Sequence, residues 1–453
     1  MSEKVLVIGG NAAGMSAASQ LRRMKKETEI IVFEKGTHVS YSSCGIPYYV
    51  GNLVDNWHNM ISRTKEEFEQ NNIHVQLRHE VKKIDTAGKT LEVTDLESGK
   101  TVTEPWDKLL IATGSVPMRP PVPGIQADGV MGVDTLDSGI LLKKWVEEHR
   151  PQNIVVIGGG YIGIEMAEAM NCHLGLNVSL VERGPQVMGT LDPDMGALVS
   201  EMLRKVGITL YLEESLLEII TVNGKATGVK TDKRTIPADL VILGLGVSPN
   251  TRLAIEAGLP TGVRNALVVD EQLRTPISDV WAAGDCVQSI NLISGKPMYI
   301  ALGTVANKQG RIAGFSMGGA DVRFPGVLGT AACRICQYEV TRTGLMEREL
   351  KELGIDYATG TIESETRAGY MPGAGEMTVK LLADRASHKL LGAQIVGTEG
   401  AAHRINTLAA AITAGMTLDN LVDMDLAYAP PFSPVWDPVQ QAARYLQGVL
   451  RRA

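Results

Sequence analysis

Cys44 is the residue of this chain whose type and setting best suit redox chemistry. It lies in the segment VSYSSCGIPYYVG, about ten residues after Glu34. The letters GIP that follow it are typical of a helix start, and a helix N-terminus lowers the pKa of a nearby thiol and so favours the reactive thiolate. The alternative is a buried cysteine that packs as a small apolar group. The segment by itself leaves both interpretations open.

A glycine turn with the spacing of a dinucleotide site follows the apolar strand predicted over Asn153 to Ile157. Gly158 permits the turn, Gly160 lets the backbone approach a pyrophosphate, and Gly163 lets the following helix pack closely on the strand. Glu182 ends the next predicted strand. Its carboxylate can accept hydrogen bonds from ribose hydroxyls and would repel a 2'-phosphate, so the pattern favours NADH over NADPH.

A near-repeat of this unit begins the chain, where KVLVIGGNAAGMSAASQLRR is followed by IIVFEKG. Gly9, Asn11 and Gly14 occupy the three glycine positions, and Glu34 occupies the acidic one. Taken alone, this copy has the alternative of a structural turn in an ordinary α/β protein. Paired with the second copy, it predicts two dinucleotide sites on an α/β, Rossmann-like architecture.

Further strand endings and a change of composition indicate how the rest of the chain is organised. Lys108 to Ile111 predicts a buried strand that turns at Thr113-Gly114, and DVWAAGDC places another strand directly before Gly284-Asp285. The composition changes near Val322, which predicts a separate α+β domain. Its expected elements are strands around 329–340 and 378–396 and a helix near 401–414.

Bulk composition excludes several classes of protein. The net charge of -7 disfavours nucleic acid as a general partner. No apolar run reaches the roughly 18 residues that span a bilayer, and the N-terminus lacks a secretory signal. We therefore expect a soluble cytoplasmic enzyme without a membrane partner. The five scattered cysteines fit a reducing compartment better than a disulfide framework.

The pair Cys333 and Cys336 has CxxC spacing, which can form a redox pair or half of a zinc site. No second pair accompanies it, and LGTAACRICQYEV reads as a strand. Residues three apart in a strand point to opposite faces. We interpret the pair as structural and expect no metal site.

An ordered set of motifs runs through the whole chain: GGNAAG (9–14), Glu34, SYSSCGIPYYVG (40–51), ATG (112–114), GGGYIGIE (158–165), AAGD (282–285), AGYMPG (368–373) and AYAPPFS (427–433). This set resembles the pyridine nucleotide-disulfide oxidoreductase family. The resemblance is to its single-cysteine branch in particular, which contains coenzyme A disulfide reductases, persulfide reductases, NADH oxidases and NADH peroxidases. It implies redox activity of Cys44.

The resemblance also implies a domain organisation and a homodimer. An FAD-binding domain (1–115 and 246–321) would be interrupted by an NAD(P)H-binding domain (116–245) and followed by a dimerisation domain (322–453). The family's dimerisation domain accounts for the chain to its end, so no C-terminal rhodanese domain is expected. The active site would lie at the subunit interface.

The cofactors implied are FAD and NADH, with NADPH as an alternative. Asp285 would bond the ribityl and phosphate region of the flavin, and Tyr161 would cover the flavin until nicotinamide displaces its ring. The full set of implied cofactor-binding residues is Gly9, Asn11, Ala12, Ala13, Gly14, Glu34, Lys35, Ser43, Ala112, Thr113, Gly114, Gly158, Gly160, Tyr161, Ile162, Gly163, Glu182, Gly246, Gly284 and Asp285.

Two positions distinguish between the branches of the family. Two-cysteine members carry a second cysteine five residues after the first, where this chain has Tyr49, so Cys44 must pair with a substrate thiol or with oxygen as a sulfenic acid. Oxidase and peroxidase relatives carry a histidine where this chain has Ala12, which favours disulfide reduction here.

Residues that contact coenzyme A in coenzyme A disulfide reductases are matched by Ser16, Gln20, Arg23 and Ser40, and Ser43 stands at a further substrate-binding position with a different residue type. The spacing of the first three places them on one face of the first helix. Tyr370 and Tyr428 match catalytic tyrosines that reach the reactive sulfur, where a phenol could protonate a leaving thiolate. The alternatives are a solvated helix end for the basic residues near Arg23 and buried structural tyrosines.

Three positions depart from that pattern, namely Ser43 in place of asparagine, Trp436 in place of a basic residue and Phe432 in place of tyrosine. They make a coenzyme A-type persulfide or another small disulfide an alternative to coenzyme A disulfide. Two further hypotheses remain: an NADH oxidase or peroxidase that cycles Cys44 through sulfenic acid, and a non-catalytic flavoprotein that senses NADH.

Overall fold

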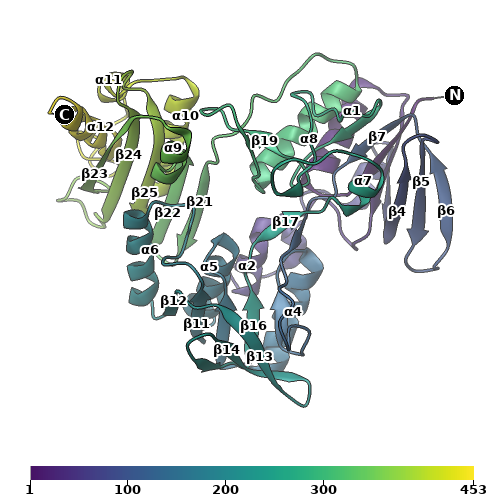
Figure 1. Cartoon of the computed structure of the whole chain (residues 1–453), viewed down its shortest axis with the longest axis horizontal. Helices are drawn as coiled ribbons and strands as arrows, with labels where there is room; N and C mark the ends of the chain where they lie inside the picture. The colour runs from purple at the N-terminus through teal and green to yellow at the C-terminus, as the bar shows by residue number, and fades with distance from the viewer. Residues whose placement is uncertain (1, 453) are drawn as a thin grey trace.

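The computed structural model describes residues 2–452 and has three lobes (Figure 1). Each lobe is built around one five-stranded sheet. Two of these sheets are parallel and the third is antiparallel. The predicted fold class, two Rossmann-like domains and a C-terminal α+β domain, is therefore confirmed.

The first parallel sheet has the order β18-β7-β1-β2-β3. Its central strand buries Val5, Leu6 and Val7 completely, as expected of a parallel strand covered on both faces. Helices α1 and α8 pack against each other beside it. The elements are β1 (Lys4–Ile8), α1 (Ala12–Met24), β2 (Glu29–Glu34), β3 (Ile73–Leu77), β7 (Lys108–Ile111), β18 (Val280–Ala282) and α8 (Gly303–Met317).

The second parallel sheet repeats this plan in the order β12-β11-β10-β16-β9. In both sheets the glycine turn leaves a central strand at the point where the strand order reverses, which is where open α/β sheets bind ligands. The elements are β9 (Val130–Gly132), α4 (Leu136–His149), β10 (Asn153–Ile157), α5 (Tyr161–Glu168) with a π-helical continuation η3 (Ala169–His173), β11 (Asn177–Glu182), α6 (Pro193–Lys205), β12 (Thr209–Leu212) and β16 (Leu240–Leu243).

The third sheet is antiparallel in the order β21-β22-β25-β24-β23. Helix α10 packs against β22 and β25, and α12 packs against β23 and β24. The elements are β21 (Ala331–Ile335), β22 (Tyr338–Gly344), α9 (Glu347–Leu353), β23 (Tyr357–Glu365), β24 (Glu376–Asp384), β25 (Leu390–Gly397), α10 (Ala401–Thr413), α11 (Leu418–Val422) and α12 (Pro438–Leu450).

Smaller elements complete the chain. Strands β8 (Ser115–Pro117) and β17 (Val247–Pro249) pair where the chain passes between the two Rossmann lobes. The others are η1 (Ser43–Gly45), α2 (Ile46–Val50), η2 (Trp57–Met60), α3 (Lys65–Glu69), β4 (His79–Asp85), β5 (Thr90–Asp95), β6 (Thr101–Pro105), β13 (Leu216–Val222), β14 (Lys225–Thr231), β15 (Thr235–Pro237), α7 (Arg252–Glu256), η4 (Val263–Asn265), β19 (Ser289–Ile290) and β20 (Pro297–Met298).

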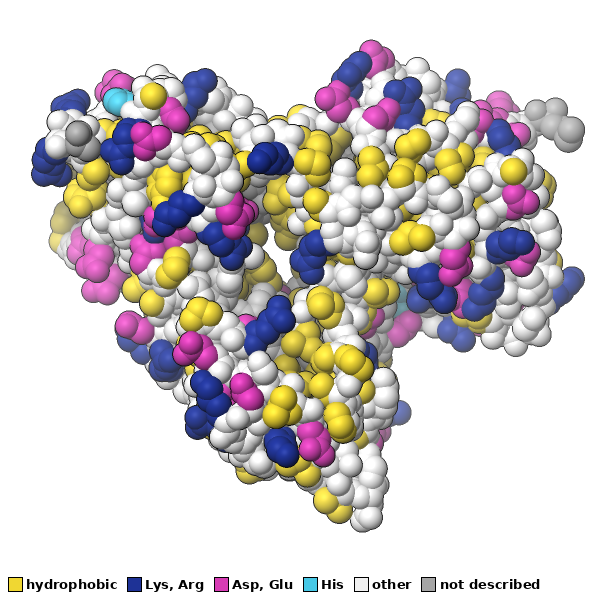
Figure 2. Space-filling model, in the orientation of Figure 1, with side chains coloured by type: hydrophobic (Ala, Val, Ile, Leu, Met, Phe, Trp, Pro, Cys, Tyr) yellow, Lys and Arg dark blue, Asp and Glu magenta, His cyan; other side chains and the backbone are white. Residues whose placement is uncertain are grey.

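The lobes share buried contacts. One apolar cluster joins Ile46 and Val50 of α2 to the second Rossmann lobe and to Ile335 and Val340 of the third sheet. Lys380 of β24 is only 2% exposed, and its ammonium lies 3.2 Å from Asp192 and 2.7 Å from Asp194 at the start of α6. The surface is hollowed where the lobes meet (Figure 2).

One predicted strand requires correction. The segment 329–340 is a hairpin, because β21 ends at Ile335 and the chain reverses at Cys336, whose φ is 52°. Cys336 therefore lies in the turn, and it forms a disulfide with Cys172. The strands predicted around 378–396 are β24 and β25, which pair antiparallel. Within residues 2–452 no helix is long and apolar enough to cross a membrane.

Candidate active site

Cys44 lies immediately before the helix predicted from its sequence. It is in the middle of η1, and α2 follows with Pro47 in its first turn. The thiol is accessible to solvent. The preceding residue, Ser43, accepts a hydrogen bond from the amide nitrogen of Asn11, with an N···O distance of 3.2 Å. The cysteine segment is thereby attached to the first glycine turn.

The expected lowering of the Cys44 pKa is wrong for this environment. Partial desolvation raises the pKa of the Cys44 thiol, and the negative charges of Glu165 and Asp285 raise it further. Helix α2 has only five residues, so its dipole is outweighed by burial and two negative charges. Asp285 belongs to the first Rossmann lobe and Glu165 to the second, so charged groups of both lobes act on the Cys44 thiol.

The first glycine turn has no room for side chains. A Cβ atom at Gly9 would lie 2.2 Å from the carbonyl oxygen of Ala112, and one at Gly14 would lie 1.9 Å from the carbonyl oxygen of Gly9. Asn11 has a φ of -110°, so its position does not require glycine. Its side-chain oxygen is buried without a hydrogen-bond partner among residues 2–452, as expected if a bound group completes the site.

The second turn repeats this geometry. Cβ atoms at Gly158 and Gly163 would lie 2.4 Å and 1.9 Å from the carbonyl oxygens of Gly244 and Gly158. A Cβ atom at Gly160 would meet nothing within 4 Å. The space beside Gly160 and the N-terminus of α5 suits a pyrophosphate. The buried hydroxyl of Tyr161, at the start of α5, has no hydrogen-bond partner in the part of the chain that the structure describes.

The acid at the end of each second strand supports its own turn. One carboxylate oxygen of Glu34 accepts from the amide of Gly10 at 2.8 Å, and one of Glu182 accepts from the amide of Gly159 at 2.7 Å. Each carboxylate also accepts from a glycine two residues further along the chain. Both carboxylates are thereby oriented beside the turns, where each oxygen keeps a lone pair for a ribose hydroxyl.

The strand endings predicted to hold cofactor gather beside the first turn. Gly284 approaches Ala13 so closely that a Cβ atom at Gly284 would lie 2.8 Å from the Cβ of Ala13. Asp285 accepts a hydrogen bond from Ser115 at 3.2 Å, and burial raises the pKa of Asp285. Gly114, with a φ of 69°, follows Ala112 and Thr113 at the end of β7, whereas Gly246, with a φ of 85°, lies by the β8–β17 pair, where its carbonyl accepts from the amide of Met118. Ala12 belongs to the first turn itself, and Lys35 follows Glu34. The role of these residues in holding the flavin nucleotide stays a prediction. Ile162 lies beside Tyr161 in the first turn of α5.

The predicted thiol-binding face follows α1. Ser16 donates to the side-chain oxygen of Asn307 on α8 at 2.8 Å. Gln20 is buried and accepts from the guanidinium of Arg23 at 3.4 Å, which confirms that these two residues share a face. Arg23 is exposed. Ser40 has a φ of 50°, and its amide donates to the carbonyl of Gly10.

Arg22 differs from its exposed neighbour. Its guanidinium donates to four backbone carbonyl oxygens, those of Lys25, Lys26, Thr28 and Asn72. Arg22 therefore stabilises the end of α1, and the alternative of a solvated helix end does not describe it. Arg23 is exposed and has no such carbonyl partners among residues 2–452.

Tyr370 and Tyr428 lie on the third lobe, away from the nucleotide turns. Their side chains are 77% and 47% exposed, so neither is the buried structural tyrosine of the alternative. Limited desolvation and then the adjacent Tyr370 phenol raise the pKa of Tyr428. Within residues 2–452 no hydrogen bond joins either tyrosine to Cys44 of the same chain. Phe432, Val435 and Trp436 are exposed on the same lobe.

Glu165 and Asn307 are site residues to which the sequence assigned no role. Burial raises the pKa of Glu165 to about 7, and the nearby carboxylate of Glu168 contributes. Glu165 lies in the motif GGGYIGIE, four residues after Tyr161, so helical spacing could have placed it one turn below that ring. Asn307 gives no such signal, because its contact with Ser16 depends on how α8 packs against α1.

Two parts of the chain match descriptions of known families. Residues 3–310 match the pyridine nucleotide-disulphide oxidoreductase family, and residues 330–438 match the dimerisation domain of the same family. The chain belongs to the pyridine nucleotide-disulphide oxidoreductase family. It is thus an oxidoreductase of a family that uses FAD and NAD(P)H, and the dimerisation domain indicates a homodimer.

Similar proteins cover almost all of the chain. An "NAD(P)H coenzyme A polysulfide/persulfide reductase" of Pyrococcus horikoshii is 38% identical over 99% of both chains. An "NADH oxidase" of Methanocaldococcus jannaschii is 35% identical over 97% of this chain and 98% of its own. The crystal structure of reduced Bacillus anthracis CoADR-RHD is 33% identical, with a TM-score of 0.96, over 100% of this chain and 81% of its own.

Proposed function

We propose that this chain is an FAD-dependent NAD(P)H oxidoreductase that reduces coenzyme A disulfide, or a coenzyme A-type persulfide or polysulfide, through Cys44. The observation that carries the proposal is the position of Cys44. Its thiol is solvent-accessible, its segment is bonded to the first glycine turn, and carboxylates of both Rossmann lobes lie near it.

The overall reaction balances as NAD(P)H, a proton and a disulfide giving NAD(P)⁺ and two thiols. Bound FAD would pass the electron pair of the hydride to sulfur. The Cys44 thiolate attacks one sulfur of the substrate disulfide, which forms a mixed disulfide and releases the first thiol. Reduction of that mixed disulfide releases the second thiol and restores Cys44. Position 49 is a tyrosine, so no second cysteine competes for Cys44 there.

The shape of the α1 face supports a long thiol substrate with an anionic far end. Helix α1 begins at Ala12, close to Ser43, and carries Arg23 in its last turn. At 1.5 Å per residue these positions are about 17 Å apart. Polar groups line the stretch between these two positions, from Ser16, Gln20 and Asn307. The sulfur of a coenzyme A-like molecule could thus reach Cys44 while its phosphates pair with Arg23.

We propose further that the partner subunit completes the site. Tyr370 and Tyr428 are exposed on the dimerisation domain, together with apolar neighbours that a homodimer would cover. A phenol delivered across the interface could donate a proton to the thiolate that leaves the substrate.

A second candidate function is NADH oxidation by oxygen or peroxide, which the similarity to the Methanocaldococcus jannaschii "NADH oxidase" supports. Ala12 argues against it, because its methyl group cannot assist oxygen chemistry as a histidine would. The non-catalytic alternative requires an inert Cys44, whereas this thiol is exposed to solvent and its segment is bonded to the first glycine turn.

Turnover with different acceptors tests all three functions. NADH consumption would be measured with coenzyme A disulfide, a coenzyme A persulfide, peroxide or oxygen, with and without air. We expect anaerobic turnover with the sulfur acceptors and a loss of at least about 1,000-fold in Cys44→Ser, because the nucleophile is lost. Ser42→Ala, two residues away, is the matched control and should keep its activity. Turnover only with oxygen would support the oxidase, and no turnover with any acceptor would support the sensor.

A further inference from the structure

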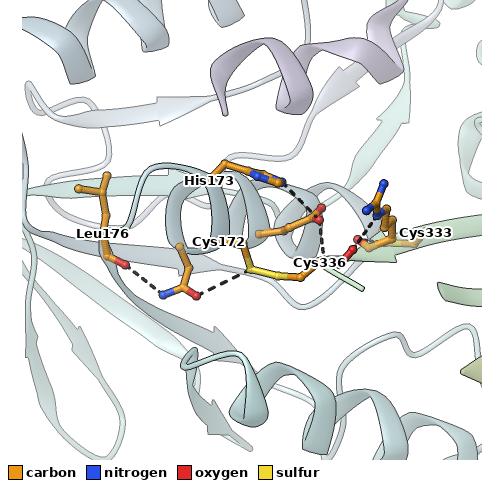
Figure 3. Close-up of a disulfide and its surroundings, with 8 residues drawn as sticks. Cys172, His173, Leu176, Cys333 and Cys336 are labelled. Carbon is orange, nitrogen blue, oxygen red and sulfur yellow. Dashed lines mark hydrogen bonds and ion pairs between the residues drawn. A yellow bond between two sulfur atoms is a disulfide. The ribbon is translucent and has the colours of Figure 1, made fainter. Parts of the chain in front are cut away.

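A disulfide between Cys172 and Cys336 connects two lobes of the molecule. Cys172 lies in η3, which continues α5 of the second Rossmann lobe, and Cys336 lies in the turn between β21 and β22 of the third lobe (Figure 3). Their Cα atoms are 6.4 Å apart, and 164 residues separate them in the sequence. The bond therefore closes a long loop and fastens one lobe to the other.

The polar groups around this bond hold the two cysteines together independently of it. The carboxylate of Glu168 accepts from the backbone amide of Cys336 at 2.7 Å and lies 3.6 Å from the imidazole of His173. Glu168 is only 2% exposed. Because these contacts do not involve sulfur, they would keep the thiols within reach of each other after reduction, so that the bond could form again (Figure 3).

The third nearby cysteine is unsuited to replace either partner. Cys333 lies within β21 and is 6% exposed, and burial raises its pKa well above the ordinary value of a thiol, with a contribution from Glu165. A buried protonated thiol reacts slowly. Cys172 and Cys336 are only partly buried, so a small disulfide can reach them.

We propose that Cys172 and Cys336 form a second redox site of this protein, distinct from Cys44, in which a reversible disulfide clamps the NAD(P)H-binding lobe to the dimerisation lobe. The oxidant is a low-molecular-weight disulfide. One cysteine thiolate attacks it, forms a mixed disulfide and releases one small thiol. The other cysteine then attacks the mixed disulfide and releases the second thiol. Two protein thiols are thus oxidised, and one small disulfide is reduced to two thiols.

The clamp would act at one end of a helix that serves the nucleotide site at its other end. Helix α5 begins at Tyr161 beside the second glycine turn and continues through η3 to the disulfide. Met166 and Met170 of this helical segment pack in the same apolar cluster as Ile335. Oxidation would therefore stabilise the contact between the helix and the hairpin.

The test uses the FAD-loaded Cys44→Ser protein, so that the catalytic thiol takes no part. The protein is treated with hydroxyethyl disulfide or with dithiothreitol, unfolded, alkylated and digested for mass spectrometry. After oxidation we expect a cross-linked peptide joining Cys172 to Cys336, and alkylation only at Cys286 and Cys333. After reduction all four remaining cysteines should be alkylated, and a second oxidation should restore the cross-link.

Thermal unfolding provides a second readout. The oxidised form should unfold at least about 3 °C above the reduced form, because the bond limits the unfolded chain. Cys172→Ser and Cys336→Ser should lose this difference, and Cys333→Ser is the matched control that should keep it. The proposal would be overturned if the Cys172–Cys336 peptide is absent after oxidation. It would also be overturned if the oxidised and reduced forms unfold at the same temperature in Cys44→Ser protein that keeps Cys172, Cys333 and Cys336. Both readouts are independent of turnover, so they do not depend on the function proposed for Cys44.

Discussion

At the scale of single residues, the electrostatics of Cys44 depend on groups from two lobes. Desolvation raises the pKa of the thiol most, and the negative charges of Glu165 and Asp285 follow. Burial, and then the charge of Glu168, raise the pKa of Glu165 to about 7. A carboxyl group that changes charge near neutral pH beside a nucleophile can adjust how readily the thiolate forms.

Replacing Glu165 by glutamine should lower the pKa of Cys44 by about 0.5 to 1, because it removes a negative charge near the thiolate. The thiolate fraction of a thiol increases with pH, so the variant should reach its full rate of alkylation at a lower pH than the wild type. The measurement is the rate at which iodoacetamide alkylates Cys44 in reduced protein, from about pH 7 to about pH 11, since the ordinary thiol pKa is about 8.5 and the pKa of Cys44 is raised.

Glu201→Gln is the control for this change, since Glu201 is exposed on α6 and its charge is screened by solvent. Equal alkylation profiles for wild type and Glu165→Gln would show that the carboxylate does not act on Cys44.

At the scale of elements, two glycines of the same turn have different tasks. Gly163 lies where α5 crosses the turn, and a Cβ atom there would meet the carbonyl oxygen of Gly158 at 1.9 Å. Gly160 has a φ of -83° and open space beside it, so the fold itself tolerates a side chain at this position. Packing therefore does not require glycine at position 160, and we propose that the open space beside it receives the nucleotide.

The variants Gly160→Ala and Gly163→Ala should separate these tasks. Gly160→Ala should change the free energy of unfolding by less than about 1 kcal/mol but raise the KM for NADH about tenfold or more, because the methyl group would meet the pyrophosphate. Gly163→Ala should destabilise the protein by about 1–3 kcal/mol, because the helix must shift away from the strand.

Thermal unfolding and steady-state kinetics with varied NADH measure both effects. A normal KM in Gly160→Ala would contradict the assignment of this turn to the nucleotide.

At the scale of the whole molecule, the third lobe is joined to the second lobe by buried ion pairs and exposes the face that we propose for the dimer. The ammonium of Lys380, surrounded by Asp192, Asp194 and Glu347, connects β24 to the start of α6. Breaking such a buried ion pair is costly because it leaves unpaired charges in the interior. The same lobe exposes Tyr370, Phe432 and Val435, which suits a surface that a second subunit covers.

Mixed dimers test whether the partner supplies the tyrosines. Cys44→Ser and the double variant Tyr370→Phe/Tyr428→Phe should each be impaired as homodimers. If each site combines Cys44 of one subunit with tyrosines of the other, a mixed dimer contains one complete site. Random exchange of subunits should then restore about one quarter of wild-type turnover, since about half of the dimers are mixed and each has one active site.

The control for the mixing experiment is Cys44→Ser exchanged with itself, which should regain nothing. If mixing the two different variants also regains nothing while mass measurements confirm mixed dimers, the site is complete within one chain.

Local patterns in the sequence determined most of the fold and the nucleotide turns. An apolar run followed by glycines at fixed spacing is typical of a buried strand and a tight turn. Strands β7 and β10 accordingly have the predicted bounds, and both glycine turns have the predicted close backbone contacts. The sequence also predicted that Cys44 lacks a second cysteine at position 49 and that a helix starts just after it, because both features depend on residues adjacent in the chain.

Only the tertiary structure decided what surrounds these residues. The raised pKa of Cys44 results from burial and from carboxylates about 120 and 240 residues away in the chain, and no local pattern reports such contacts. The contact between Ser16 and Asn307 and the bond between Cys172 and Cys336 likewise depend on how distant elements pack. Spacing therefore predicts which residues can do chemistry, whereas packing determines their charge, their partners and their reactivity.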